Sequence, residues 1–198
     1  SVLSATNSKA AGNTFISIWM ATQRGVTAVR KMSAATSIVQ EMEGTHMKNN
    51  KERLYIAYGS NLNLRQMAHR CPTAEVVGKS LLRGWRLMFR GGSHSAVATV
   101  ERMPGHSVPV LIWRLQPSDE EALDVYEGWP RLYRKETIRL TVNGRRVYAM
   151  IYIMNEQGHP YGKPSSFYLN TICEGYHSCK FDPEILLTAV ADSRKEAL

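Results

Sequence analysis

Two short segments of the chain carry residue types that could perform chemistry, and the first is Tyr58-Gly59-Ser60-Asn61. It directly follows a run of aromatic and β-branched residues that predicts a strand. A glycine and two small polar residues at a strand end let backbone N–H groups point into a cavity, where they bind a carboxylate or a developing oxyanion. The same residue types also form ordinary strand-to-helix turns, in which Ser and Asn cap a helix. Both interpretations fit the spacing.

The second segment surrounds Glu127, which precedes Gly128 and has Tyr126 and Trp129 as aromatic neighbours. Desolvation in such surroundings raises the pKa of a carboxyl toward neutrality, as general acid–base catalysis requires. A negative charge at the C-terminal end of a helix is mildly unfavourable, which indicates a reason for its presence. The alternative is a solvent-facing Glu at a helix C-cap.

The elements around the first segment follow from residue patterns. Residues 54–58 predict a short strand and residues 64–70 a helix capped by Asn61 or Asn63. Residues 74–89 are expected to be extended, with breaks at Gly78 and Gly84. Residues 95–102 and 108–115 predict a hairpin that turns at Pro104-Gly105.

The elements around and after Glu127 are similarly marked. Ser118 and Glu121 have the spacing of a capping box, which predicts a helix that starts there and runs to about Tyr126. Asn143-Gly144 predicts a type I′ turn between strands 135–142 and 145–154. Helices are expected at 165–172 and 182–196. Five to seven strands in hairpins with short flanking helices indicate an α+β domain built on a small mixed, mainly antiparallel, barrel-like sheet.

Residues 1–46 differ from the rest, because they are rich in Ser, Thr and Ala and their first acidic residue is Glu41. Apolar residues at steps of three and four predict a helix over about 13–43. Three interpretations compete: an organelle transit peptide, a natural extension that packs on the domain or a partner, and an addition from cloning. We favour the last, because Gly44-Thr45-His46-Met47 resembles a cloning junction. The domain is then expected to span 47–198, after an N-terminal helical extension.

Composition limits the remaining function classes. The 198 residues include 25 Lys and Arg and 17 Asp and Glu, and 43% are hydrophobic, so the chain is expected to fold. No run of about 18 apolar residues occurs, which excludes a membrane-spanning helix. The scattered charge of +8 suits a nucleic acid or a small anionic substrate, but no nucleic-acid-binding motif accompanies it.

The cysteines and other polar side chains indicate little chemistry of their own. Cys71, Cys173 and Cys179 lack zinc-ligand spacing and favour a reducing, cytoplasmic compartment; Cys173 and Cys179 are expected to be buried free thiols rather than a pair. Ser60 lacks the surroundings of a hydrolase nucleophile. We interpret two further groups as solvated: His94, His106 and His159, and Arg83, Arg86 and Arg90.

Together, the two chemical segments resemble the γ-glutamylcyclotransferase-like family, of the AIG2-like kind. The strand-turn AYGSNLN is followed about 65 residues later by LDVYEG and by the spaced Arg131, Tyr133 and Lys135. The resemblance covers about residues 53–175. It implies a small mixed barrel with flanking helices, and Glu127 as the catalytic carboxylate. The substrate-binding residues that it implies are Tyr55, Ile56, Ala57, Tyr58, Gly59, Ser60, Asn61 and Tyr168.

The reaction implied by the resemblance is the cyclisation of a γ-glutamyl compound to 5-oxoproline with release of an amine or amino acid. It needs no metal or cofactor, and the sequence offers no ligand cluster for one. The expected partner is a small γ-glutamyl molecule, without nucleic acid or membrane; a homodimer stays open. The alternative is a non-catalytic module that binds an acidic metabolite or peptide end. Glu127 favours the enzyme, since a binder of anions gains nothing from a carboxylate in its pocket.

Overall fold

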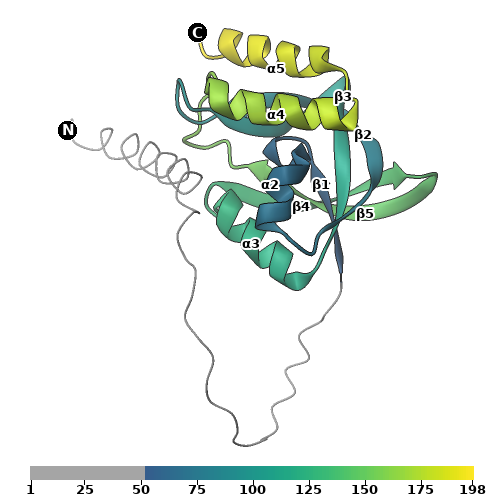
Figure 1. Ribbon diagram of the computed structural model, residues 1–198. Helices are drawn as coiled ribbons and strands as arrows, with labels where there is room; N and C mark the ends of the chain where they lie inside the picture. Colours follow the sequence, from purple (N-terminus) through teal and green to yellow (C-terminus); the bar gives the residue numbers. More distant parts are fainter. Residues whose placement is uncertain (1–51) are drawn as a thin grey trace, which may run out of the picture.

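The computed structural model describes residues 52–198, so the helix predicted over about 13–43 and the suggested cloning junction at residues 44–47 lie outside the described part. Five strands and five helical segments follow one another in this part (Figure 1). The strands are β1 (Arg53–Ala57), β2 (Glu75–Arg90), β3 (Val97–Leu115), β4 (Tyr133–Val142) and β5 (Arg145–Met154). The helices are the 3₁₀ turn η1 (Ser60–Leu62), α2 (Leu64–Arg70), α3 (Pro117–Glu127), α4 (Ser166–Cys179) and α5 (Pro183–Lys195).

The strands form one mixed sheet in the order β2-β3-β1-β5-β4. Only the central strand β1 and its neighbour β5 are parallel; the other three pairs are antiparallel. The sheet is open, but its curl brings the two edge strands together at one end. There the Ser80 hydroxyl donates to the Thr141 carbonyl at 2.6 Å, and the Asn143 amide donates to the Val77 carbonyl at 3.0 Å. The predicted α+β class with a mainly antiparallel sheet is confirmed.

The prediction of a hairpin that turns at Pro104-Gly105 is wrong, because both of the strands predicted for it belong to the single strand β3. Residues on either side of the Pro-Gly pair bond to β2 instead of to each other: Arg102 lies opposite Trp85, and Ser107 opposite Arg83. The residues between them form a bulge in the long β3 strand. The Pro-Gly pair therefore marks a bulge here and not a turn between two strands, because the neighbouring strand β2 is long enough to pair with β3 on both sides of it.

The other turn signals agree with the structure. The register of β2 shifts between Val76 and Gly78 and again between Arg83 and Trp85, at the two glycines where breaks were expected. Asn143 and Gly144 have φ values of 49° and 77°, as a type I′ turn requires, and they join β4 to β5.

The start of α3 differs from prediction by two residues. Gln116, not Ser118, is the N-cap, and Asp119 completes the capping box by accepting from the Gln116 N–H at 3.0 Å. Pro117 occupies the first helical position, where its missing N–H is harmless. Asp119 is also buried, with the Thr73 hydroxyl donating to it at 2.7 Å. The box forms on Asp119 rather than on Glu121 because Asp119 lies three residues after the N-cap residue Gln116, as a capping box requires.

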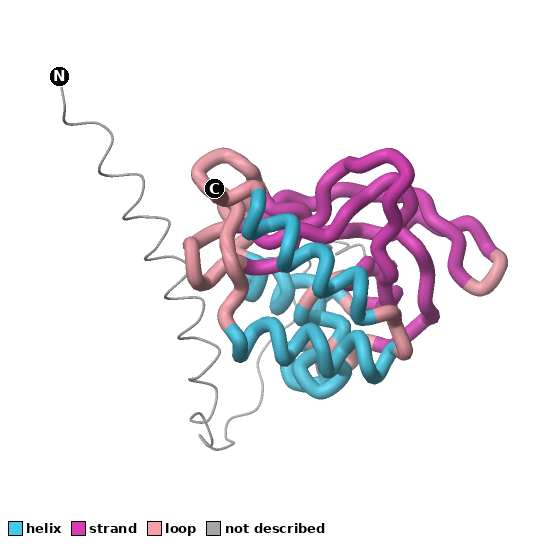
Figure 2. The backbone as a smooth tube through the Cα atoms, turned by 90° about the horizontal axis from the view of Figure 1, so that it is seen from above, coloured by secondary structure: helices cyan, strands magenta, loops and turns pink. Residues whose placement is uncertain are grey.

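Figure 2 shows the helices gathered on one side of the sheet, with α4 and α5 next to each other. The core between these layers contains large buried side chains such as Phe89, Ile112 and Tyr176. The Ser193 hydroxyl of α5 accepts from the Phe89 N–H at 2.8 Å and ties that helix to β2. None of the helices within residues 52–198 has the length and apolarity to cross a membrane.

Several side chains expected to be solvated are in fact partnered. Arg86 and Arg90 both form ion pairs with Glu101, at 3.1 and 2.6 Å, and of the three arginines only Arg83 is exposed. His159 is half-buried, and its Nδ1 lies 2.7 Å from the Asn155 carbonyl oxygen, whereas the other two histidines are exposed. The cysteines are free, but Cys173 is exposed rather than buried.

Candidate active site

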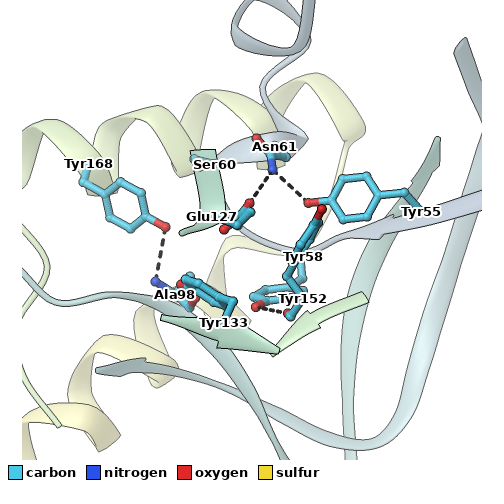
Figure 3. A pocket seen from close by; sticks show the side chains of 10 residues that line it. Tyr55, Tyr58, Ser60, Asn61, Ala98, Glu127, Tyr133, Tyr152 and Tyr168 are labelled. Atoms are coloured by element: carbon cyan, nitrogen blue, oxygen red, sulfur yellow. Dashed lines mark hydrogen bonds between the residues drawn. The ribbon is translucent and has the colours of Figure 1, made fainter. Parts of the chain in front are cut away.

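Glu127 and the loop after β1 meet in one pocket of about 310 Å³ (Figure 3). The elements that surround it are β1 and its loop, the end of α3, strands β3, β4 and β5, and the first turn of α4. Five of the ten lining residues are tyrosines, so the wall is apolar in its body and polar at its tips. The lining residues are Tyr55, Tyr58, Gly59, Ser60, Asn61, Ala98, Glu127, Tyr133, Tyr152 and Tyr168.

The loop after β1 both caps a helix and lines the pocket. Asn63 caps α2, because its side-chain oxygen accepts from the N–H groups of Arg65 and Gln66. Ser60 and Asn61 are thus not needed as caps, and both lie in the pocket wall. The two interpretations of the segment apply to different residues of it: Asn63 makes the structural turn, while residues 58–61 line the pocket.

Gly59 is the position where the loop comes closest to β3. A Cβ at Gly59 would lie 3.1 Å from the Ala98 Cβ and 3.6 Å from the Tyr168 hydroxyl oxygen. The φ of Gly59 is −118°, so the residue is required by lack of space rather than by a left-handed backbone. A side chain here would push the loop away from β3 or enter the pocket.

Glu127 is the last residue of α3, and its side chain turns inward. Gly128 ends the helix in the left-handed conformation, with φ of 63°. The Glu127 side chain is 8% exposed, which excludes the alternative of a solvent-facing C-cap residue. Burial raises the pKa of the Glu127 carboxyl to about 7, although the positive charge of Arg70 and a hydrogen bond from Asn61 both favour the ionised form.

Asn61 connects the carboxylate to a cation. Its Nδ2 donates to Glu127 Oε1 and to the Tyr55 hydroxyl, each at 2.8 Å. Its Oδ1 accepts from the Arg70 guanidinium at 2.7 Å, and the guanidinium carbon of Arg70 lies 3.5 Å above the ring centroid of Tyr126. The side chain of Asn61 thus has a defined orientation, with its amino group toward Glu127.

The tyrosines on the opposite wall present neutral hydroxyl groups. The Tyr133 hydroxyl donates to the Ala98 carbonyl at 2.6 Å, and the Tyr168 hydroxyl accepts from the Ala98 N–H at 3.2 Å. Burial raises the pKa of both phenols above the ordinary value, so they stay protonated at neutral pH. Neutral phenols allow Glu127 to be the group that exchanges protons in this pocket.

Seven of the nine residues proposed for the site line this pocket. The exceptions are Ile56 and Ala57, which are fully buried in β1 and do not reach the pocket. Tyr133, Tyr152 and Ala98 complete the wall. Tyr133 lies in the Arg-x-Tyr-x-Lys pattern after the second segment, and this pattern was the only feature of the sequence that pointed to it as a site residue. Nothing in the local sequence distinguishes Ala98 and Tyr152 from other strand residues.

Comparison with known proteins agrees with this geometry. A family model described as gamma-glutamyl cyclotransferase, AIG2-like, matches residues 55–169, which contain all ten lining residues. The chain belongs to this family and is an enzyme of the γ-glutamylcyclotransferase kind. No group of three or more His, Cys, Asp or Glu side chains placed to hold a metal ion occurs within residues 52–198.

Individual relatives are distant but cover most of the domain. The chain is 30% identical to a gamma-glutamylcyclotransferase of Mus musculus over 145 residues, covering 68% of this chain and 76% of the mouse protein. It is also 30% identical to the Homo sapiens protein of the same name, over 62% of this chain and 69% of the human one. A solved structure titled gamma-glutamyl cyclotransferase has the same fold, with a TM-score of 0.63 at 24% identity, covering 70% of this chain and 86% of that one.

Proposed function

We propose that the enzyme cyclises a γ-glutamyl compound to 5-oxoproline and releases the attached amine or amino acid, with Glu127 as the general acid and base. The observation that carries this proposal is the buried Glu127 carboxyl, which lies in the pocket wall and has a pKa of about 7. A group with this pKa both accepts and donates protons near neutral pH.

The substrate contains its own nucleophile, because its α-amine can attack its own γ-carbonyl carbon and close a five-membered ring. The reaction is thus unimolecular, and the protein needs to hold the bent substrate and move protons. Glu127 takes one proton from the α-ammonium group, which frees the lone pair that forms the new C–N bond. It then gives that proton to the leaving nitrogen as the original C–N bond breaks, and the second proton of the new ring nitrogen passes to the released amine, so the carboxyl returns to its starting state.

The loop after β1 is proposed to bind the negative charge of the substrate. The first N–H groups of a helical turn have no acceptor within the turn, and residues 59–61 begin η1. These groups would hold the α-carboxylate or the oxyanion that forms on the γ-carbonyl oxygen. The Tyr168 hydroxyl oxygen lies 3.6 Å from the position that a Cβ on Gly59 would take, and it is proposed to contact the substrate. Tyr55, Tyr58, Ser60 and Asn61 complete the proposed substrate-binding set.

The proposed compartment is the cytoplasm, and the proposed partner is a small molecule. The free thiols of all three cysteines are consistent with the reducing environment of the cytoplasm. The pocket is small and contains a carboxylate, so its ligand is expected to be a small molecule rather than a nucleic acid. A homodimer stays a prediction, which the molar mass in solution tests.

The decisive experiment incubates the protein with a panel of γ-glutamyl amino acids and amines and measures 5-oxoproline by mass spectrometry. Wild type should convert at least one member, and Glu127→Gln should lower turnover by about 10²–10⁴-fold. Glu121→Gln is the matched control, because Glu121 lies on the same helix and is exposed. Binding of a γ-glutamyl compound without any conversion would instead favour a non-catalytic binding module. Full turnover by Glu127→Gln would refute the proposed mechanism.

A further inference from the structure

A second hollow lies between the two edge strands of the sheet, β2 and β4, and reaches the corner between α4 and α5. It shares no lining residue with the Glu127 pocket. We call this hollow the edge groove. The β4–β5 hairpin beside it extends away from the two C-terminal helices (Figure 1).

The edge groove is strongly positive. Five of its lining residues are cationic and none is acidic. All five are exposed, and within residues 52–198 none of them forms an ion pair with a carboxylate. The cations are Lys79, Arg83, Arg102, Arg139 and Lys180. Their mutual repulsion is therefore not neutralised within the described chain, which favours an anionic ligand.

Aromatic side chains form part of the groove floor and position two of the cations. The Arg102 guanidinium carbon lies 4.0 Å from the ring centroid of Trp85, and Lys79 Nζ lies 5.9 Å from that of Phe181. Such contacts hold the cationic groups over an apolar surface and leave their charge available. A ligand that fits must combine negatively charged groups with apolar groups, for example in alternation along its length.

The groove also contains unpaired strand edges. The outer edge of β2 is occupied near both ends, where Ser80 contacts β4 and where the Phe89 N–H donates to Ser193 of α5. Between these points, residues 81–85 pair with no second strand within the described residues, and neither do residues 138–140 of β4. Unpaired edges present N–H and C=O groups that pair readily with another extended chain.

We propose that the edge groove binds an extended peptide rich in acidic side chains, which adds to the sheet as a further strand along the free edge of β2 at residues 81–85. The peptide backbone pairs with this free edge, and its carboxylates face the five cations. A nucleic acid would satisfy the cations but could not use the strand edges, so the geometry favours a peptide.

The test uses a fluorescein-labelled peptide of about ten residues that alternates Glu and Val, since side chains alternate between the faces of a strand. Binding is followed by fluorescence anisotropy. The groove variant is Arg83→Glu combined with Arg139→Glu. The matched control is Arg145→Glu combined with Arg146→Glu, which changes the net charge equally at exposed positions outside the groove. Turnover of both variants on a γ-glutamyl substrate should equal that of wild type.

The groove variant should bind the peptide at least about tenfold more weakly than wild type, and the control should change by less than about twofold. Methylation of every second peptide nitrogen should also abolish binding, because it removes main-chain donors. Absence of binding, equal losses in both variants, or full affinity of the methylated peptide would overturn the proposal. Equally tight binding of a single-stranded oligonucleotide of the same charge would overturn it as well, in favour of a general polyanion site.

Discussion

The Arg70 guanidinium donates to Asn61 Oδ1 at 2.7 Å and thereby determines which end of the amide faces Glu127. With its oxygen held by Arg70, Asn61 must present its amino group to the carboxylate, at 2.8 Å. Arg70 therefore acts on Glu127 in two ways, through its charge and through the orientation of the Asn61 amide. A buried carboxylate needs both, since burial alone would keep it protonated.

Replacing Arg70 by Met should raise the pKa of Glu127 further above 7, by about one unit, because a nearby positive charge and a fixed hydrogen-bond donor are lost. The base must be ionised to act, so the acid limb of kcat/KM should move to higher pH. The pH profile of 5-oxoproline formation measures this shift. Arg65→Met, on the exposed part of α2, is the control and should leave the profile in place. An unchanged profile for Arg70→Met would show that Arg70 does not influence the carboxyl.

Glu127→Gln should stabilise the fold at high pH. The pKa of Glu127 is raised from 4.5 to about 7 in the native state, so its contribution to stability is fully present below pH 4.5 and is lost as the pH rises through 7. A Gln side chain does not ionise, so its contribution to stability is not lost as the pH rises. The free energy of unfolding of the variant should therefore exceed that of wild type by up to about 3 kcal/mol at pH 8, and the two values should converge near pH 4.

Urea denaturation at a series of pH values measures this difference in the free energy of unfolding. Glu121→Gln, at an exposed site, should follow wild type throughout. A Glu127→Gln curve parallel to wild type from pH 4 to pH 8 would contradict the raised pKa, whatever the activity of the variant.

Gly59→Val should weaken substrate binding more than it weakens the fold. The added Cβ would lie 3.1 Å from Ala98 Cβ, and the two methyl groups would extend from a loop that lines the pocket. We expect KM to rise by at least about tenfold and the free energy of unfolding to fall by about 1–3 kcal/mol, as for other overpacked sites. Steady-state kinetics and thermal denaturation of the same samples distinguish the two effects. An unchanged KM would remove this loop from the substrate site.

Deletion of residues 1–46 should leave the melting temperature of the remaining chain within a few degrees of that of the full chain. This expectation follows from the break in composition and from the sequence Gly-Thr-His-Met at residues 44–47. Differential scanning calorimetry of both chains tests it. Aggregation of the shortened chain, or a large drop in its melting temperature, would indicate that the segment packs on the domain.

Local sequence determined the elements whose signals are contained within a few residues. The Asn143-Gly144 turn formed as expected, because its two left-handed positions are a local requirement. Helix α2 has the predicted bounds, since Asn63 caps it and the helix ends immediately before Cys71 and Pro72. The two segments that could do chemistry were also visible, because a strand-end Gly-Ser-Asn turn and a Glu before a helix-ending Gly are local patterns.

Tertiary structure alone decided which of these residues meet. The Pro104-Gly105 signal did not make a hairpin, because a long β2 strand pairs with both flanks of β3. Ile56 and Ala57 are adjacent to pocket residues in sequence but lie in the core, whereas Ala98 and Tyr152 come from other strands to complete the wall. The pKa of Glu127 likewise depends on burial and on Arg70, 57 positions away along the chain. Burial and long-range charge are properties of the packed chain, and a local pattern of residues does not contain them.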